Sequence, residues 1–520
     1  MELNRGRALK VAEPVLPEAG AVAEMIQGWA ATEPKFGGLL MAGVPASQAL
    51  ARWGLELLWA NQAMEAVAAL RAALALNPAD AVLWANYGLA LQQGQSWGEA
   101  AACLERSLAL SPSQPDTWMA LGVARKNLED LEGAETAYRM ALQQNPKLEV
   151  GWQLLGMLKE EQKDFSKAIE CFDHCVSLGG KSAALFANLG KLHYQLGQVA
   201  KSAAAYARAA ELDSANAHYR RMAAKAAFSR EVLEGGVVEE AIARYRNSFG
   251  QEEAGSKEAL TELLSSSFAM LSGFGHIEAA IRLGRKLVEL WPENATWRYL
   301  LSALASDATI ERSPAEYVVE HFDAFAQGFD AQLVGALGYD IPEKLCAAAR
   351  KITGEGSVRD TLDMGCGTGL CGPLLRPISR ALTGVDLSPK MLEEAAKKGV
   401  YDTLACEELT AFLRRSPNQF DLVVAADLLI YFGDLAPLFQ AAAAALRRDG
   451  LFAFSTEGWA GEGYRLLPSG RFSHAPGYVR FLAERGFAEV ESFATTIRLE
   501  ANGRLPGNIF VFRRREAELR

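Results

Sequence analysis

The first half of the chain repeats itself every 34 residues. Five series of residues keep this step, and each series holds one side-chain type or close equivalents. The series are Trp84, Trp118, Trp152 and Phe186; Gly88, Gly122, Gly156 and Gly190; Ala66, Ala100, Ala134 and Ala168; Pro78, Pro112 and Pro146; and Leu70, Leu104, Tyr138, Phe172 and Tyr206. One period shared by aligned series predicts a solenoid of helix–turn–helix units.

The repeated residue types suit two antiparallel helices. Glycine in the first helix and alanine in the second allow a close approach, aromatic residues fill the gap to the next repeat, and proline ends the second helix. The period and order resemble the tetratricopeptide repeat (TPR). We expect TPR repeats over 47–216, a degenerate TPR-like helical region over 217–312, and an N-terminal helical or linker segment over 1–46 without a signal peptide.

Solenoids usually bind something in their concave groove. The resemblance implies a protein or peptide partner there. The inward positions carry a mixed set of side chains, namely Gln92, Gln93, Asp116, Met119, Lys126, Asn127, Gln153, Met157, Glu160, Lys191 and Tyr194. This mixture does not support the subset of the family that grips acidic C-terminal peptides. A helical platform that shapes or oligomerises the protein is the alternative.

Length and charge exclude several classes of protein. A chain of 520 residues is too long for one core. Its net charge of −10 argues against a nucleic-acid partner, and no apolar run is long enough to span a membrane. Seven scattered cysteines predict reduced thiols in a cytoplasmic protein. Cys171 and Cys175, with His174 between them, favour helix packing over a metal site, so no metal is predicted.

A glycine-rich segment follows a predicted buried strand over 358–364. Asp363 ends the strand, and three glycines stand behind it at alternate positions: Gly365, Gly367 and Gly369. Glycine lacks a Cβ, so the backbone can turn tightly against a ligand. A second strand over 381–385 ends in Asp386, which can accept hydrogen bonds from two ribose hydroxyls. The G-x-G-x-G spacing favours S-adenosylmethionine (SAM) over a dinucleotide, because no third glycine seats a pyrophosphate.

From about Ser313 the 34-residue step is lost, and helix and strand patterns alternate. Helices are predicted over 315–337, 342–350 and 477–485, and further strands over 402–406, 420–426, 450–455, 488–499 and 508–513. The closing hairpin predicts a parallel sheet with one antiparallel strand inserted. The expected fold class is therefore α + α/β: an all-α TPR solenoid followed by a Rossmann-like, seven-stranded α/β domain over 313–520.

Residues from about His321 to Arg514 resemble a class I SAM-dependent methyltransferase, and more narrowly the predicted methyltransferases that carry TPR repeats. The matching segments are 321–323, 329–330, 338–339, 362–369, 383–388, 401–402, 420–427, 468–474 and 506–507. The resemblance implies SAM as the cofactor. It names no methyl acceptor.

By this resemblance, Asp363 and the backbone of the glycine loop hold the methionine part of SAM, and Asp386 takes the ribose hydroxyls. The adenine contact is expected at Glu408, which Leu409 follows as in the family pattern, with Glu407 as the alternative. The expected cofactor-binding residues are Asp363, Gly365, Cys366, Gly367, Gly369, Asp386, Leu387, Glu408 and Asp427.

A nitrogen or oxygen acceptor must lose a proton, so a base is expected. His474, in a predicted loop over 469–476, is the expected base, and a helix-capping role is its alternative. Arg471 is expected to bind a substrate carboxylate or phosphate, and Asp427 to line the methyl-transfer cavity. His321 lies on an amphipathic helix that, by the resemblance, closes over SAM.

The sequence thus predicts a cytoplasmic SAM-dependent methyltransferase whose TPR solenoid recruits or orients a substrate or partner. The alternative is a TPR adaptor whose Rossmann-like domain is a non-catalytic SAM-binding or structural module. The glycine spacing disfavours a third class, the nicotinamide-dependent oxidoreductases.

Overall fold

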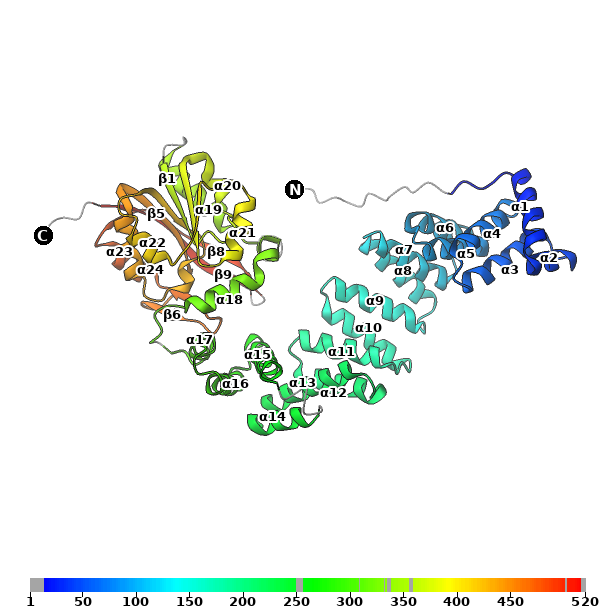
Figure 1. Ribbon diagram of the computed structural model, residues 1–520, viewed down its shortest axis with the longest axis horizontal. Helices are drawn as coiled ribbons and strands as arrows, with labels where there is room; N and C mark the ends of the chain where they lie inside the picture. Colours follow the sequence, from blue (N-terminus) through cyan, green and yellow to red (C-terminus); the bar gives the residue numbers. More distant parts are fainter. Residues whose placement is uncertain are drawn as a thin grey trace. The chain divides into compact units, whose positions relative to one another are not determined.

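The computed structural model of the chain is drawn in Figure 1. It describes residues 14–248, 256–307, 309–331, 333, 338–354, 359–500 and 503–515. The chain divides into two compact units, Met1–Arg230 and Glu231–Arg520. Residues 1–13 of the N-terminal segment expected over 1–46, and Val358, the first residue of the strand expected over 358–364, lie outside the described residues.

The first unit is built from antiparallel helix pairs. Its helices are α1 (Ala19–Thr32), α2 (Pro34–Met41), α3 (Ala46–Trp59), α4 (Ala63–Leu76), α5 (Ala81–Gln93), α6 (Trp97–Leu110), α7 (Pro115–Asn127), α8 (Leu131–Gln144), α9 (Glu149–Glu161), α10 (Phe165–Ser177), α11 (Ala183–Gln195), α12 (Val199–Leu212) and the start of α13 (Ala217–Leu233). Figure 1 shows the pairs from α3 to α12 stacked one after another. The predicted solenoid is confirmed.

The glycine of each first helix lies beneath a large side chain of the second helix. A Cβ at Gly122 would be 2.4 Å from Cε1 of Tyr138, and one at Gly88 would be 2.7 Å from Cγ of Leu104. The same contact recurs in three other pairs: Gly54 with Leu70, Gly156 with Phe172 and Gly190 with Tyr206. The 34-residue period therefore arises because the same glycine contact between the two helices is repeated in each helix pair.

The tryptophan series closes the turn between repeats. In three repeats an indole N–H donates to a proline carbonyl six residues earlier: Trp84 to Pro78 at 2.9 Å, Trp118 to Pro112 at 3.0 Å and Trp152 to Pro146 at 2.9 Å. The second helices α4, α6 and α8 end two residues before these prolines. Proline disfavours helix in the residue before it, so it marks the end of each repeat.

Some of the side chains predicted to line the groove form ion pairs within the solenoid. Lys126 of α7 pairs with Glu161 of α9 at 3.0 Å, and Lys191 of α11 pairs with Glu160 of α9 at 2.5 Å. These ion pairs join the first helices of successive repeats. The mixed set of groove residues therefore includes charges that are already paired with each other.

The second unit begins with more helices and continues into an α/β domain. The helices are α14 (Val238–Asn247), α15 (Lys257–Gly273), α16 (Ile277–Leu290), α17 (Ala295–Leu304), α18 (Ala315–Phe325) and η1 (Ala326–Gly328). Helix α17 packs directly on the α/β domain, because Tyr299 and Ala303 share a buried cluster with Tyr317, Leu466 and Phe472. The boundary expected at residue 313 runs through these contacts.

One mixed sheet forms the α/β domain. Its strands are β1 (Arg359–Met364), β2 (Ser379–Asp386), β3 (Thr403–Cys406), β4 (Phe420–Ala425), β5 (Leu446–Gly458), β6 (Tyr464–Leu466), β7 (Phe472–His474), β8 (Phe487–Glu500) and β9 (Gly503–Arg514). Strands β3, β2, β1, β4 and β5 are parallel neighbours, and β9 lies antiparallel between β5 and β8. The predicted sheet with one inserted antiparallel strand is confirmed.

Helices cover both faces of this sheet. They are α19 (Ile341–Thr353), α20 (Gly372–Leu375), η3 (Arg376–Ile378), α21 (Pro389–Lys397), α22 (Leu409–Arg414), η4 (Leu429–Tyr431), α23 (Ala436–Ala445) and α24 (Pro476–Ala483). Residues alternate between the two cores: Val423 packs with α22, α23 and α24, whereas its neighbours Leu422 and Val424 pack with α19 and α20. Burial on both faces explains the unbroken apolar run of β4.

The hairpin of β6 and β7 adds two strands to the seven that were expected. The sequence analysis interpreted residues 469–476 as a loop, because three-residue strands carry no readable alternation. Strand β7 pairs with β5 at Glu457 and Gly458, beyond Phe454, where the pairing of β4 with β5 ends. The hairpin therefore lies past the C-terminal end of β4.

Replacing Gly122 with alanine is expected to destabilise the solenoid by about 1–3 kcal/mol, because the new Cβ overlaps a fully buried Tyr138 ring. Thermal unfolding of the full chain measures the change. Gly28→Ala is the matched control, since a Cβ at this helical position meets nothing within 4 Å. Equal unfolding temperatures for the two variants would contradict the packing argument.

A fragment that starts at Glu231 is expected to unfold at a temperature about 5–10 °C higher than one that starts at Ile310. The shorter fragment lacks α17, so the apolar surface of Tyr317, Leu466 and Phe472 that α17 covers becomes exposed. Calorimetry of both fragments tests this. Identical unfolding temperatures would show that α17 contributes nothing to the α/β domain.

Candidate functional site

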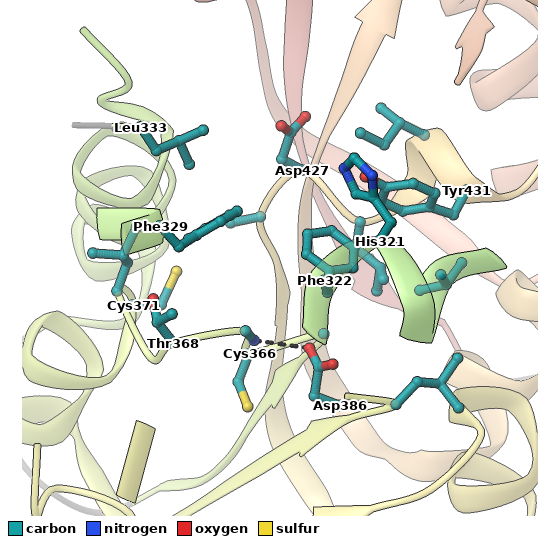
Figure 2. A pocket seen from close by; sticks show the side chains of 18 of the residues that line it. His321, Phe322, Phe329, Leu333, Cys366, Thr368, Cys371, Asp386, Asp427 and Tyr431 are labelled. Carbon is teal, nitrogen blue, oxygen red and sulfur yellow. Dashed lines mark hydrogen bonds between the residues drawn. The ribbon is translucent and has the colours of Figure 1, made fainter. Parts of the chain in front are cut away.

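The C-terminal ends of β1, β2 and β4 open into one cavity of about 320 Å³ (Figure 2). The glycine loop after β1, the segments after β2 and β4, helix α18 and strand β8 all contribute to its walls. Parallel sheets place their ligand sites at this edge, as the sequence analysis expected. The cavity has two chemically different ends.

The glycine loop forms the inner wall. Gly365 has φ +69° and Gly367 has φ +52°, a region that favours glycine. A Cβ at Gly365 would lie 2.6 Å from Cδ1 of Leu428, whereas one at Gly367 would meet no protein atom within 4 Å. Gly367 lines the cavity, so its open side is a cradle for a ligand. Gly369 stays outside the lining and packs against Tyr401.

Asp363 lies at the bottom of this inner end and is 1% exposed. Its Oδ2 accepts a hydrogen bond of 2.6 Å from the hydroxyl of Tyr401. Burial raises the pKa of Asp363 to about 7, and the Tyr401 bond opposes that rise. A ligand cation beside this carboxylate would favour its ionised form. Tyr401 lies in one of the segments that carry the family resemblance, but no role was predicted for it from the sequence.

Asp386 ends β2 and faces the same end. Its Oδ2 accepts from the backbone N–H of Gly367 at 2.8 Å, and its Oδ1 accepts from Ser388 N–H at 2.9 Å. Figure 2 shows the carboxylate next to the loop at Cys366. Each carboxylate oxygen can accept a second hydrogen bond, so both hydroxyls of a ribose can be bound. Leu387 and Cys366 also line the cavity.

Glu407 and Glu408 do not line the cavity. Glu408 caps α22 by accepting from Ala411 N–H at 2.7 Å, and its other oxygen is 3.2 Å from Nη2 of Arg312. Glu407 is paired with Arg415. The lining residue of this segment is Leu409.

Four alternating charges form a chain at the other end of the cavity. Asp427 has φ +51°, and its Oδ2 accepts from Nη1 of Arg498 at 2.9 Å. Nη2 of Arg498 donates to Glu457 Oε1 at 2.6 Å, and Nε of Arg471 is 3.0 Å from the same oxygen. Asp427, Arg471 and Arg498 line the cavity, as expected for the first two. Arg498 and Glu457 were not predicted as site residues, because their only signal in the sequence is a charge within or just after a predicted strand.

His474 lies away from the cavity. It is fully buried, its Nε2 is 2.9 Å from the carbonyl oxygen of Phe432, and burial lowers its pKa to about 4. It is also not a helix cap, because α24 begins after Ala475 without a side-chain cap. The geometry therefore favours a packing role for His474 beneath the β6–β7 hairpin.

Of the histidines in the described part of the chain, only His321 lines the cavity. It belongs to the inward face of α18 with Phe322 and Phe325. In Figure 2, His321 and Tyr431 both lie toward the Asp427 end and away from the glycine loop. His321 is exposed at the cavity, but partial desolvation, and secondly Arg471, lower its pKa, so the ring is a neutral base near pH 7.

Two carboxylates hold α18 and the following turn over the cofactor loops. Asp323 accepts from Ser388 Oγ at 2.5 Å, and Asp330 accepts from Thr368 Oγ1 and from Lys398 Nζ, the latter at 2.9 Å. Phe329 continues the aromatic wall of the cavity. The helix thus closes one side of the site.

The other chemistry weighed from the sequence lies outside this cavity. Cys171 and Cys175 are buried in α10, and burial raises their pKa values to about 11 and about 12, so both thiols are protonated. Within the described residues, no group of three or more His, Cys, Asp or Glu side chains is arranged to hold a metal ion. Among the helices described, none is both long and apolar enough to cross a bilayer.

Comparisons with known proteins identify both regions. Residues 362–454 match the methyltransferase domain family, and residues 52–115, 88–149 and 154–217 match the tetratricopeptide repeat family. The ubiquinone biosynthesis O-methyltransferase of Bordetella pertussis is 28% identical over 165 residues, which are 30% of this chain and 65% of that protein. The chain thus spans slightly less than two thirds of that relative's length.

Two further similarities cover a shorter part of the chain or have a lower sequence identity. A probable S-adenosylmethionine-dependent methyltransferase of Saccharomyces cerevisiae is 31% identical over 109 residues, which are 19% of this chain and 36% of that protein. The crystal structure of MamA protein overlaps 34% of this chain and 95% of its own, with 17% identity and a TM-score of 0.31.

Asp363→Asn is expected to stabilise the ligand-free protein above pH 7. Burial raises the Asp363 pKa from 3.8 to about 7, so folding takes up a proton between these values and the stability of the natural protein falls as pH rises through this window. Asparagine has no such dependence and still accepts from Tyr401. Unfolding temperatures from pH 4 to 8 should show a gap that widens up to pH 7 and then levels off.

Asp173→Asn, at an exposed position of α10, is the control and should show no such gap. A difference between Asp363→Asn and the natural protein that stays constant over the whole pH range would rule out the raised pKa.

Proposed function

We propose that this chain, which carries a methyltransferase domain behind a tetratricopeptide-repeat region, transfers a methyl group from SAM to an acceptor bound at the Asp427 end of its cavity. The observation that carries the proposal is the cavity itself. Its inner end holds a glycine cradle, the buried carboxylate of Asp363 and the half-buried carboxylate of Asp386, and its other end holds a neutral histidine and the Asp427–Arg498–Glu457–Arg471 charge chain.

The inner end fits SAM in charge and shape. Asp363 is suited to the ammonium group of the methionine part, because a cation there would ionise a carboxyl whose pKa is near 7. Asp386 is suited to the two ribose hydroxyls, and the open side of Gly367 leaves room for the ligand. The adenine ring would lie toward Leu409, and Glu408 stays a proposal for its amino group.

Held by Asp363, Asp386 and the glycine loop, SAM would supply a methyl group on a sulfonium for transfer to the acceptor's lone pair, with S-adenosylhomocysteine as the leaving group. The protein must align the acceptor and exclude water. Phe322, Phe329 and Tyr431 line the middle of the cavity and provide an apolar wall. Asp427 and Arg471 orient the acceptor, and we assign the acceptor's proton to His321 in place of His474.

The names of two relatives and the charges of the cavity favour an oxygen atom as the methyl acceptor. The Bordetella relative is named as an O-methyltransferase, and a relative in Acetivibrio thermocellus is named as a malonyl-[acyl-carrier protein] O-methyltransferase. An oxygen acceptor suits a site with two arginines, because guanidinium groups stabilise an oxygen that is losing its proton. The repeat region would bring in the substrate or a protein partner.

Asp386→Ala is expected to weaken SAM binding by roughly two to four orders of magnitude, since it removes two charge-assisted hydrogen bonds of about 1.5–3 kcal/mol each. Calorimetric titration of the full chain with SAM, S-adenosylhomocysteine and NAD measures the loss and identifies the cofactor. Asp173→Ala is the control for a lost surface carboxylate.

The unfolding temperature of Asp386→Ala must be checked in parallel, because this carboxylate also holds the glycine loop through Gly367. A folded Asp386→Ala protein that binds SAM within about threefold of the natural affinity would remove Asp386 from the site. Failure of the natural protein to bind SAM would favour the adaptor alternative.

A further inference from the structure

We propose that Tyr299, on helix α17, is a positioning residue for the acceptor end of the cavity. Its hydroxyl joins the segment before α18 to the turn of the β6–β7 hairpin, and thereby fixes Arg471 and His321 where the acceptor would bind. The inference rests on the proposed function, and it makes the last helix before the α/β domain part of the active site's support.

The hydroxyl of Tyr299 has two partners inside the protein. It donates to the carbonyl oxygen of Gly470 at 2.7 Å, and it lies 2.7 Å from Oγ of Ser313. Tyr299 is 2% exposed. The bond to Gly470 joins residues that are 171 positions apart. The helix that precedes the sheet therefore connects the hairpin turn to the segment before α18.

The first branch leads to Arg471. Gly470 forms the hairpin turn with φ +74°, and its N–H donates to the carbonyl of Leu467 at 2.9 Å. A Cβ at Gly470 would be 2.9 Å from the hydroxyl oxygen of Tyr317, so the turn is held tightly against α18. The next residue is Arg471, which lines the cavity. The Tyr299 bond therefore fixes the backbone directly before Arg471.

The second branch leads to the segment after β4. The backbone N–H of Ser313 donates to the carbonyl of Tyr431 at 2.9 Å, and the N–H of Gly433 donates to Glu311 at 2.6 Å. Between these two hydrogen bonds, the backbones of Arg312 and Phe432 form an isolated antiparallel β-bridge. Tyr431 and Phe432 line the cavity. Tyr299 thus holds one end of a short β-like pairing that shapes the cavity wall.

An aromatic series connects the same tyrosine to His321. The ring centres of Tyr299 and Tyr317 are 4.9 Å apart, and those of Tyr317 and His321 are 5.9 Å apart with nearly parallel planes. Tyr317 and His321 stand one helical turn apart on α18, which explains why they meet. Two of the side chains that we assign to the acceptor are therefore linked to Tyr299: Arg471 follows Gly470, which Tyr299 binds, and His321 stacks on Tyr317, which Tyr299 contacts.

The experiment measures the pKa of His321 in the full chain by NMR with labelled histidine, the signal being identified by its loss in His321→Gln. The charged and titratable groups at this end of the cavity are Arg312, Tyr317, Asp427, Tyr431, Glu457, Arg471 and Arg498. Arg471→Gln should raise the pKa of His321 by about 0.5 unit or more, the effect of one charge about 6 Å away at the dielectric constant of water.

Tyr299→Phe should raise the His321 pKa in the same direction, because the released turn lets Arg471 move away. The double variant Tyr299→Phe, Arg471→Gln should have the same His321 pKa as Arg471→Gln alone, since both changes act through the charge of Arg471. Ser313→Ala tests the second partner and should have a smaller effect of the same sign. Tyr206→Phe, at a buried tyrosine of α12, is the matched control and should leave the pKa unchanged.

SAM affinity, measured by calorimetry, should be unchanged in Tyr299→Phe, because the cofactor residues lie at the other end of the cavity. A folded Tyr299→Phe protein whose His321 pKa equals that of the natural chain would overturn the proposal and leave Tyr299 a packing residue. An unchanged pKa in Arg471→Gln would overturn it as well. Loss of SAM binding in the natural protein would instead refute the proposed function.

Discussion

Buried charge at the ends of parallel strands is the constraint on which the rest of the α/β domain depends. The strand order brings Asp363, Asp386 and Asp427 to one edge of the sheet, and burial raises the pKa values of Asp363 and Asp386. Each has a different compensation: the Tyr401 hydroxyl for Asp363, backbone N–H groups for Asp386, and the Arg498 guanidinium for Asp427. Asp363 can therefore still pair with a ligand cation, and Asp386 can still accept from ligand hydroxyls. Asp427 is instead held in place by the guanidinium group of Arg498.

The parts of the structure that the sequence predicted are those set by local spacing. The period of 34 follows from one glycine contact in each repeat, and the glycine loop follows from positive φ angles at Gly365, Gly367 and Gly369, so both leave a pattern in neighbouring positions. The parallel sheet with one inserted antiparallel strand followed from the alternating helix and strand patterns and the closing hairpin. Asp363, Asp386 and Leu387 line the cavity as expected.

The parts that escaped prediction depend on contacts between distant segments. Arg498 meets Glu457 across 41 positions and Asp427 across 71, and no local rule links them. The surroundings of the two histidines have the same cause, because β7 turns His474 into the core whereas α18 turns His321 to the cavity. The helix-capping bond of Glu408 also forms only once α22 is folded, and the adenine contact predicted for this residue stays a prediction.

The charge chain at the Asp427 end of the cavity is suited more to specificity than to stability. Burying ion pairs costs desolvation energy, and apolar residues of similar size often replace such pairs without loss of stability. Here the chain holds equal numbers of positive and negative groups, so it adds no net charge to the cavity while it fixes the directions of two guanidinium groups. A fixed guanidinium can hold an acceptor oxygen at one orientation. Because the hairpin turn that supplies Arg471 is bonded to α17, the geometry of this end depends on a helix outside the sheet.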